Sequence, residues 1–328
     1  MTKILKLFII TFLLLEFPAW GQRYSISAVN GDTVLKTENI QANVDYLCSE
    51  SLGGRATGTD GARNAAYWLQ GQFRVLGLKP LTGAWLHGFN TSDGLARNVI
   101  GLIPGSSFPT RYVILMAHYD NLGTLNGSFY PGADSNASGV AALLEIARMV
   151  THMNTCHKMY GSGLIVVALD AKEKNQAGAD ELWRLIDQHK LTDPVSGNPI
   201  YKDQISLVVN LDQLGGTTAP LTEGNPRYLM MLSEESNGRR SALESSNQDR
   251  GLGLELAWDY YGSKDFTRLF YRRISDQRVF LENGIPSVMF TSGITLMNNK
   301  PQDTPESLDY DVLKDRIRLI FRYLDKVL

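Results

Sequence analysis

The sequence contains few cysteines and has a small net charge. Only two cysteines, Cys48 and Cys156, occur among 328 residues. Two cysteines exclude a disulfide framework, and they could either pair with each other or remain two separate thiols. The formal net charge is −2, and no basic tract, heptad pattern or repeat is visible. The composition therefore gives no reason to expect binding to nucleic acid or to an anionic membrane.

An apolar run long enough to cross a membrane is also lacking. The run at residues 7–15 is well short of the roughly 20 residues that a spanning helix needs. Lys3 and Lys6 precede it, and Ala19 and Gly21 follow it at the spacing of a cleavage site. We predict a signal peptide at residues 1–21, removed before Gln22. The mature chain would then be periplasmic or secreted, with no membrane span.

What remains is an ordinary globular composition, with 43% hydrophobic and 20% charged residues. Short apolar, β-branched runs predict strands, and amphipathic stretches between them predict helices. The predicted strands are residues 98–103, 112–116, 163–169, 205–211 and 286–290. The predicted helices begin near residue 37 and then cover residues 62–76, 139–150, 177–189 and 310–328. We predict an α/β fold in which a mixed, mostly parallel twisted sheet lies between two helical layers.

Nothing in the composition divides the mature chain. No Pro/Ser-rich linker interrupts residues 22–328, so we expect one domain over that range. Residues 217–264 are polar and weakly periodic, and we interpret them as an insertion that shapes the rim of a pocket.

Polar and ionisable side chains follow four of the predicted strands. His118 ends one strand, residues 170–173 follow the next, Asp212 ends a third, and residues 293–303 follow the last. Ligands of such sheets bind beyond the carboxyl ends of the strands. We therefore expect a site where these four strand ends meet.

Several motifs around these positions resemble the secreted di-zinc aminopeptidase family, which also contains glutaminyl cyclases. They occur in the order and spacing of that family across residues 40–328. The matching segments are Ala117-His118-Tyr119-Asp120, residues 132–139, residues 168–174, Asn210-Leu211-Asp212, Ser275-Asp276, Gly284-Ile285-Pro286 and Asp303-Thr304-Pro305. The resemblance implies a three-layer zinc-peptidase fold.

Four residues match functional positions of that family. In the family, two zinc ions share a bridging carboxylate and activate a water, and a neighbouring Glu takes the proton of that water. The resemblance implies that His118 and Asp212 bind one ion and that Glu173 binds the other. Asp120 matches the carboxylate that orients the histidine.

Three other positions depart from the family pattern. Ser135 replaces the bridging Asp, Lys172 replaces the general-base Glu, and Asn299 replaces the second His. A hydroxyl, an ammonium and an amide are poor substitutes for these groups. Asp134 and Asp170 are possible substitute ligands nearby. If neither substitutes, one ion keeps two protein ligands and the other keeps one, where a tight zinc site has at least about three. We therefore expect no zinc, or weakly bound zinc.

Lys172 also suggests how such a site could remain stable without metal. Carboxylates crowded together repel one another. We hypothesise that the Lys172 ammonium takes over part of the electrostatic role of the metal by pairing with Glu173, Asp212 or Asp170. Adjacent strand residues point in opposite directions, so Lys172 can reach Glu173 only if the backbone turns there.

Two functions remain open from the sequence. One is an exported, non-hydrolytic protein that binds a peptide or protein at the rim formed by the strand ends, as receptor ectodomains of the family do. The other is an active zinc-dependent aminopeptidase with unorthodox ligands. No residue is assigned a catalytic role with certainty, although Lys172 occupies the general-base position.

Overall fold

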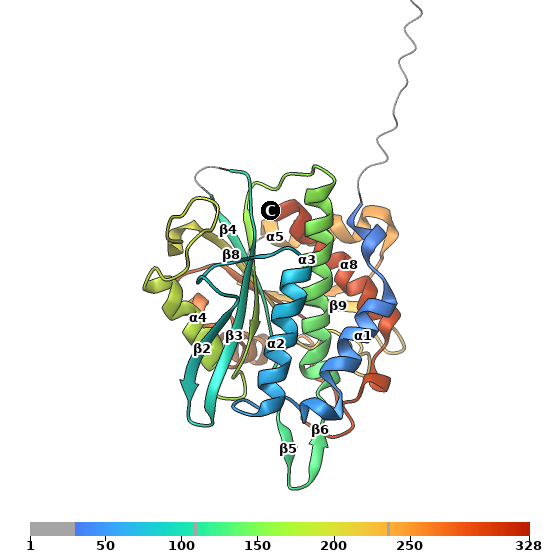
Figure 1. Cartoon of the computed structure of the whole chain (residues 1–328). Coiled ribbons are helices and arrows are strands. Elements are labelled where there is room, and N and C mark those ends of the chain that lie inside the picture. Colours follow the sequence, from blue (N-terminus) through green and yellow to red (C-terminus); the bar gives the residue numbers. More distant parts are fainter. Residues whose placement is uncertain (1–29, 108–109, 235–236) are drawn as a thin grey trace, which may run out of the picture.

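A nine-stranded sheet covered by helices on both faces forms the centre of the molecule (Figure 1). The structure is a computed structural model, and it describes residues 30–107, 110–234 and 237–328. The predicted signal peptide, residues 1–21, lies outside the described residues.

The strand order of the large sheet is β1-β3-β7-β4-β8-β11-β9-β10, and β2 pairs with β3 at one edge. Its four central strands, β7, β4, β8 and β11, are mutually parallel, while β3 and β9 run antiparallel to their central neighbours. The strands are β1 (Lys79–Pro80), β2 (Leu86–Thr91), β3 (Gly94–Ile103), β4 (Tyr112–His118), β7 (Gly163–Leu169), β8 (Ile205–Leu211), β9 (Tyr228–Ser233), β10 (Glu255–Ala257) and β11 (Ser287–Thr291). A separate hairpin joins β5 (Gly123–Leu125) to β6 (Ser128–Tyr130). This sheet confirms the predicted mixed, centrally parallel architecture.

The central strands are apolar throughout because both faces of the sheet are covered. Every residue of β4 and β7 is buried, which explains why these runs do not alternate between polar and apolar residues. The predicted strands at residues 163–169 and 205–211 match β7 and β8 in both bounds.

Helices form the two outer layers. They are α1 (Thr37–Leu47), α2 (Asp60–Val75), α3 (Gly139–Thr155), α4 (Ala177–Asp187), α5 (Asn237–Gln248), α6 (Lys264–Leu269), α7 (Arg278–Glu282) and α8 (Tyr310–Val327). Leu69, Leu143 and Ile320 belong to one apolar core, which places α2, α3 and α8 on one face of the sheet. Leu182 and Phe280 belong to a second core on the other face, under α4 and α7. Figure 1 shows α2 and α3 on one side of the strands and α4 on the other.

The interpretation of residues 217–264 as an insertion is wrong in part. This stretch contains β9 and β10, which extend the large sheet, and α5. Five of the six β9 residues are buried, but β10 has only three residues, so neither gives a long periodic signal. The edge strands β1 and β2 were also missed, since β1 is two residues long and β2 is largely polar and partly exposed.

The two cysteines are not bonded to each other. Cys48 is buried after α1, and Cys156 is partly buried after α3. They are therefore two separate thiols, one of the two alternatives left open by the sequence. Within the described part of the chain, no helix combines the length and the apolar character needed to cross a membrane.

Candidate functional site

His118 and Asp212 meet at the carboxyl ends of two neighbouring parallel strands, β4 and β8. The imidazole Nε2 lies 3.5 Å from Asp212 Oδ1. Both atoms are buried, and neither has a hydrogen-bond partner among the described residues. Burial and the Lys172 ammonium lower the pKa of His118, but the carboxylates of Asp120 and Asp212 outweigh them and raise it to about 10. His118 is thus held as an imidazolium, which has no free lone pair to offer.

Asp120 lies beside His118, as the resemblance implied, but its carboxylate is directed mainly at the backbone. Its two oxygens accept hydrogen bonds from the N–H groups of Lys172 (3.0 Å) and Glu173 (3.1 Å). The His118 Nδ1 atom is 3.7 Å from Asp120 Oδ1 and only 3.1 Å from the Asp120 carbonyl oxygen. Burial opposes ionisation of Asp120, but His118 and the two N–H groups together hold its pKa below the usual value. Asp120 therefore fixes both the imidazole and the start of the next loop.

Lys172 and Glu173 lie in a turn that brings their side chains together. Ala171 has a φ of +61°, so the alternation of side chains along β7 ends before Lys172. Lys172 Nζ lies 3.3 Å from Glu173 Oε1. Burial lowers the pKa of Lys172, but Asp212, Glu173 and Asp276 act in the opposite direction and hold it above its ordinary value. The ammonium is the cation that these carboxylates share.

Asp276 is a member of this cluster that the sequence reasoning quoted only as part of a motif. It is 1% exposed, and neither of its carboxylate oxygens has a hydrogen-bond partner among the described residues. Burial raises its pKa to about 7, while His118 and Lys172 partly counteract this effect. Its place in the Ser275-Asp276 motif was the signal that could have nominated it.

The two possible substitute ligands are engaged elsewhere. Asp134 Oδ1 accepts hydrogen bonds from the N–H groups of Gly215 (2.8 Å) and Gly216 (3.0 Å), while its Oδ2 is buried and has no hydrogen-bond partner among the described residues.

Asp170 is committed even more fully. Its carboxylate accepts hydrogen bonds from the Thr57 hydroxyl (2.9 Å), the Tyr119 hydroxyl (3.0 Å) and the N–H of Arg97 (2.9 Å). The same carboxylate accepts a fourth hydrogen bond, from the N–H of Ala171 (2.7 Å). Both aspartates thus serve as anchors for loops.

Ser135 and Asn299, the other two positions at which the chain departs from the family pattern, differ from each other in burial. Ser135 is buried, and its N–H donates to Asp303 Oδ2 at 3.1 Å. Asn299 is exposed, with a φ of +57°. Asn299 lines the same cavity as Lys172, Glu173 and Asp212, whereas Ser135 does not.

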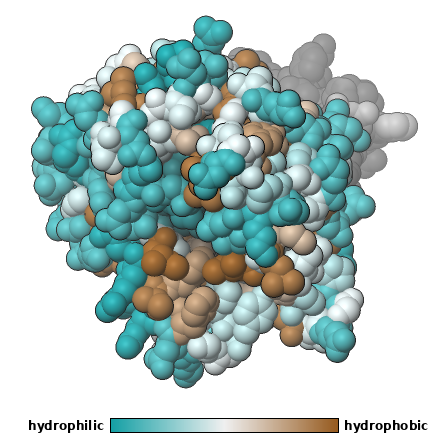
Figure 2. Space-filling model, turned by 90° about the horizontal axis from the view of Figure 1, so that it is seen from below, coloured by the Kyte–Doolittle hydropathy of each residue, from teal (hydrophilic) through white to brown (hydrophobic). Residues whose placement is uncertain are grey.

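That cavity has a volume of about 280 Å³. Its charged floor is formed by Lys172, Glu173 and Asp212, and its apolar wall by Phe270, Ile274 and Ile294. It opens on the face where the central strands end, which Figure 2 shows from below. Apolar side chains are densest in the lower middle of this face and are surrounded by hydrophilic residues, with smaller apolar spots elsewhere (Figure 2). A ligand bound there would meet both charged and apolar groups.

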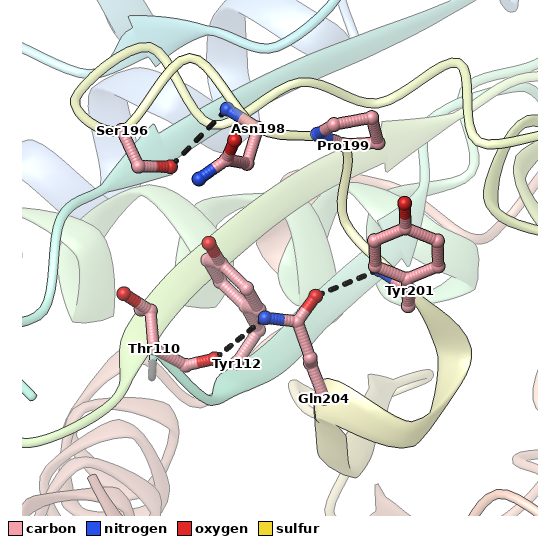
Figure 3. Close-up of a pocket in the computed structure, with 7 residues that line it drawn as sticks. All are labelled: Thr110, Tyr112, Ser196, Asn198, Pro199, Tyr201 and Gln204. Atoms are coloured by element: carbon pink, nitrogen blue, oxygen red, sulfur yellow. Dashed lines mark hydrogen bonds between the residues drawn. The ribbon is translucent and has the colours of Figure 1, made fainter. Parts of the chain in front are cut away.

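A second hollow, of about 240 Å³, lies at the opposite ends of the strands (Figure 3). Gln204 bridges it by donating to the Thr110 carbonyl (3.1 Å) and accepting from the N–H of Tyr201 (2.9 Å). None of its lining residues is charged. It therefore lacks the charged side chains that line the first cavity.

The donors around His118 do not fit a zinc ion. Among residues 30–107, 110–234 and 237–328, no three His, Cys, Asp or Glu side chains lie together in a way that could hold a metal. His118 and Asp212 face each other with unpaired atoms, but the Lys172 ammonium would repel a dication. A structural or catalytic zinc normally has at least about three protein ligands.

Comparison with known proteins places these motifs in a family. Over 332 residues the chain is 25% identical to the uncharacterized protein YfbL of Escherichia coli, covering 94% of each chain. Over 155 residues it is 31% identical to the BOS complex subunit ncln of Danio rerio, and this match covers 44% of the chain but 26% of the fish protein. A zinc aminopeptidase from Bacillus subtilis has the same fold, with a TM-score of 0.66, 14% identity and coverage of 89% and 95% of the two chains. Residues 98–324 match the sequence model of Peptidase family M28, and the chain belongs to that family.

Proposed function

We propose that this chain is a non-hydrolytic member of its family that binds a peptide or protein segment at the rim formed by the strand ends. The observation that carries the proposal is the Lys172–Glu173 ion pair, with its 3.3 Å contact. It places a fixed positive charge among Glu173, Asp212 and Asp276, the acidic side chains on which a metal centre would depend.

Hydrolysis would also lack a base. Lys172 occupies the general-base position, and its neighbours keep the pKa of its ammonium above the ordinary value. A group that stays protonated at neutral pH cannot take a proton from water. Glu173 is the adjacent carboxylate, and it is already paired with that ammonium.

Peptide binding is supported by the composition of the cavity. The carboxylates and ammonium on its floor can pair with the charged ends of a peptide, and Phe270, Ile274 and Ile294 can contact an apolar side chain. Ile274 in this wall is 45% exposed, and Leu296, which does not line the cavity, is 74% exposed. Exposed apolar groups beside a pocket favour contact with another protein. The similarity to a relative named as a subunit of a complex agrees with such a role.

The first residues of the chain are the basis for the cellular location that we propose. We infer that residues 1–21 are removed on export and that residues 22–328 act as one unit in the periplasm or outside the cell.

A zinc-dependent aminopeptidase is the second candidate. It is favoured by the unpaired His118 Nε2 and Asp212 Oδ1 atoms, which are 3.5 Å apart. Metal binding there would require His118 to lose its proton and a further donor to join. The unpaired carboxylate of Asp276 is one such donor, whereas Asp134 Oδ1 and the Asp170 carboxylate are held by other hydrogen bonds.

The role of Lys172 predicts a pH-dependent loss of stability in the variant Lys172→Met. Removing one partner of a buried ion pair costs about 3–5 kcal/mol, and since the Lys172 side chain is 19% exposed we expect about 2 kcal/mol at pH 7. Without the ammonium, the pKa values of Asp212 and Asp276 rise, so the folded variant binds more protons than the wild type. The deficit should therefore shrink between pH 7 and pH 5.

Urea unfolding at the two pH values measures this deficit. Lys172→Arg retains the charge and should lose much less stability. A Lys172→Met protein as stable as the wild type at pH 7 would show that the ammonium is not needed.

Restoring the family residues should restore the metal. In the triple variant Ser135→Asp, Lys172→Glu, Asn299→His, both ions regain their expected ligand sets, so we expect about two zinc ions per chain after dialysis. The wild-type chain should retain none, as measured by elemental analysis of both proteins. Stoichiometric zinc in the wild type would instead support the aminopeptidase alternative.

The binding function itself can be tested with a library of peptides that have free N-termini. We expect the wild type to select peptides, and Ile294→Glu to weaken their binding by about tenfold or more because it places a charge on the apolar wall. Gln204→Ala, in the hollow of Figure 3, is the control and should leave affinity unchanged.

Calorimetry and mass spectrometry of the selected peptides give the two readouts. If no peptide is selected, or Ile294→Glu binds as tightly as the control, the site is not a peptide-binding site. Release of N-terminal residues from the peptides would contradict the non-hydrolytic assignment.

A further inference from the structure

We call the cavity lined by Lys172, Glu173 and Asp212 the peptide cavity. A second cavity near it, of about 390 Å³ and distinct from the hollow of Figure 3, lies on the other side of the segment that forms the wall of the peptide cavity. This segment consists of α6 and the π-helical turn Phe270–Ile274 that continues it. Phe270 and Ile274 line the peptide cavity, whereas Arg268 and Tyr271 line the second one. We call the second cavity the basic pocket and define it by Ser233, Arg240, Trp258, Lys264, Arg268 and Arg272.

Positive charge is in excess in the basic pocket. Among the described residues, four cations line it, against the two carboxylates of Glu234 and Asp259. Glu234 is paired with Arg272, and Asp259 accepts a hydrogen bond from the N–H of Gly262 at 2.7 Å. In the part of the chain that the structure describes, no ion pair joins the remaining cations to a carboxylate. Those cations are Arg240, Lys264 and Arg268.

Arg240 is held in position by its contact with Trp258. Its guanidinium lies over the indole ring, 5.4 Å from the ring centroid. Stacking of this kind orients the planar group and leaves its edge for hydrogen bonding. A guanidinium edge matches the two oxygens of a carboxylate or phosphate.

We propose that the basic pocket binds a small, multiply charged oxyanion of the carboxylate or phosphate class. Three cations without a carboxylate partner among the described residues call for a ligand with more than one negative charge, and the stacked Arg240 guanidinium calls for acceptor oxygens. The cavity volume is in the range of small-molecule sites. This binding site is separate from the peptide cavity and does not depend on the function proposed for it.

Calorimetric titration of the full-length chain with citrate and, separately, with pyrophosphate tests this site at constant ionic strength. We expect at least one of the two to bind with a Kd below about 1 mM. In the double variant Lys264→Gln, Arg268→Gln, loss of two exposed cations should weaken binding by about tenfold or more while leaving the fold intact. Citrate alone would identify a polycarboxylate site, and pyrophosphate alone would identify a phosphate site.

The matched control is Arg74→Gln, Lys190→Gln, which removes one exposed arginine and one exposed lysine outside the pocket. It should bind the anion as the wild type does. The proposal is overturned if neither anion binds in the millimolar range, or if the control loses as much affinity as the pocket variant.

Discussion

The Lys172 ammonium, placed among the carboxylates of Glu173, Asp212 and Asp276, is the interaction on which the site depends. These acidic groups converge because parallel strands end at the same edge of the sheet, and their mutual repulsion has to be balanced. The family resemblance implies that two dications provide that balance in a zinc-binding member. Here the Lys172 side chain supplies a single charge, fixed in place by the turn after β7 and by hydrogen bonds from the N–H groups of Lys172 and Glu173 to Asp120.

The same replacement changes the chemistry that the site can perform. An ammonium cannot polarise a carbonyl or activate a water as a metal pair does, and His118 is held as an imidazolium between two carboxylates. What survives is a cavity with charged groups on its floor and an apolar wall. Such a cavity is suited to recognition. The segment that forms its apolar wall also separates it from the basic pocket, so that one short helical stretch borders two cavities.

The sequence was sufficient to predict the central sheet and the convergence of His118, Lys172, Glu173 and Asp212, because long buried apolar runs and the polar residues that end them are strong signals. Edge strands such as β10 carry too few residues to produce such a signal. The role of Asp276 was missed because it depends on which groups surround it in space, and a carboxylate without partners looks like any other in a sequence. The hydrogen-bond partners of Asp134 and Asp170 depend on loop conformations, which the periodicity of the sequence does not encode.

The central claim is that Lys172 remains a cation in the place of a metal, and NMR of its side chain, labelled with ¹³C at Cε, tests this claim most directly. The account predicts that the Lys172 resonance titrates above the ordinary lysine pKa of about 10.4, with no change on addition of zinc. A resonance that titrates at or below the ordinary value, or that shifts with stoichiometric zinc, would contradict it.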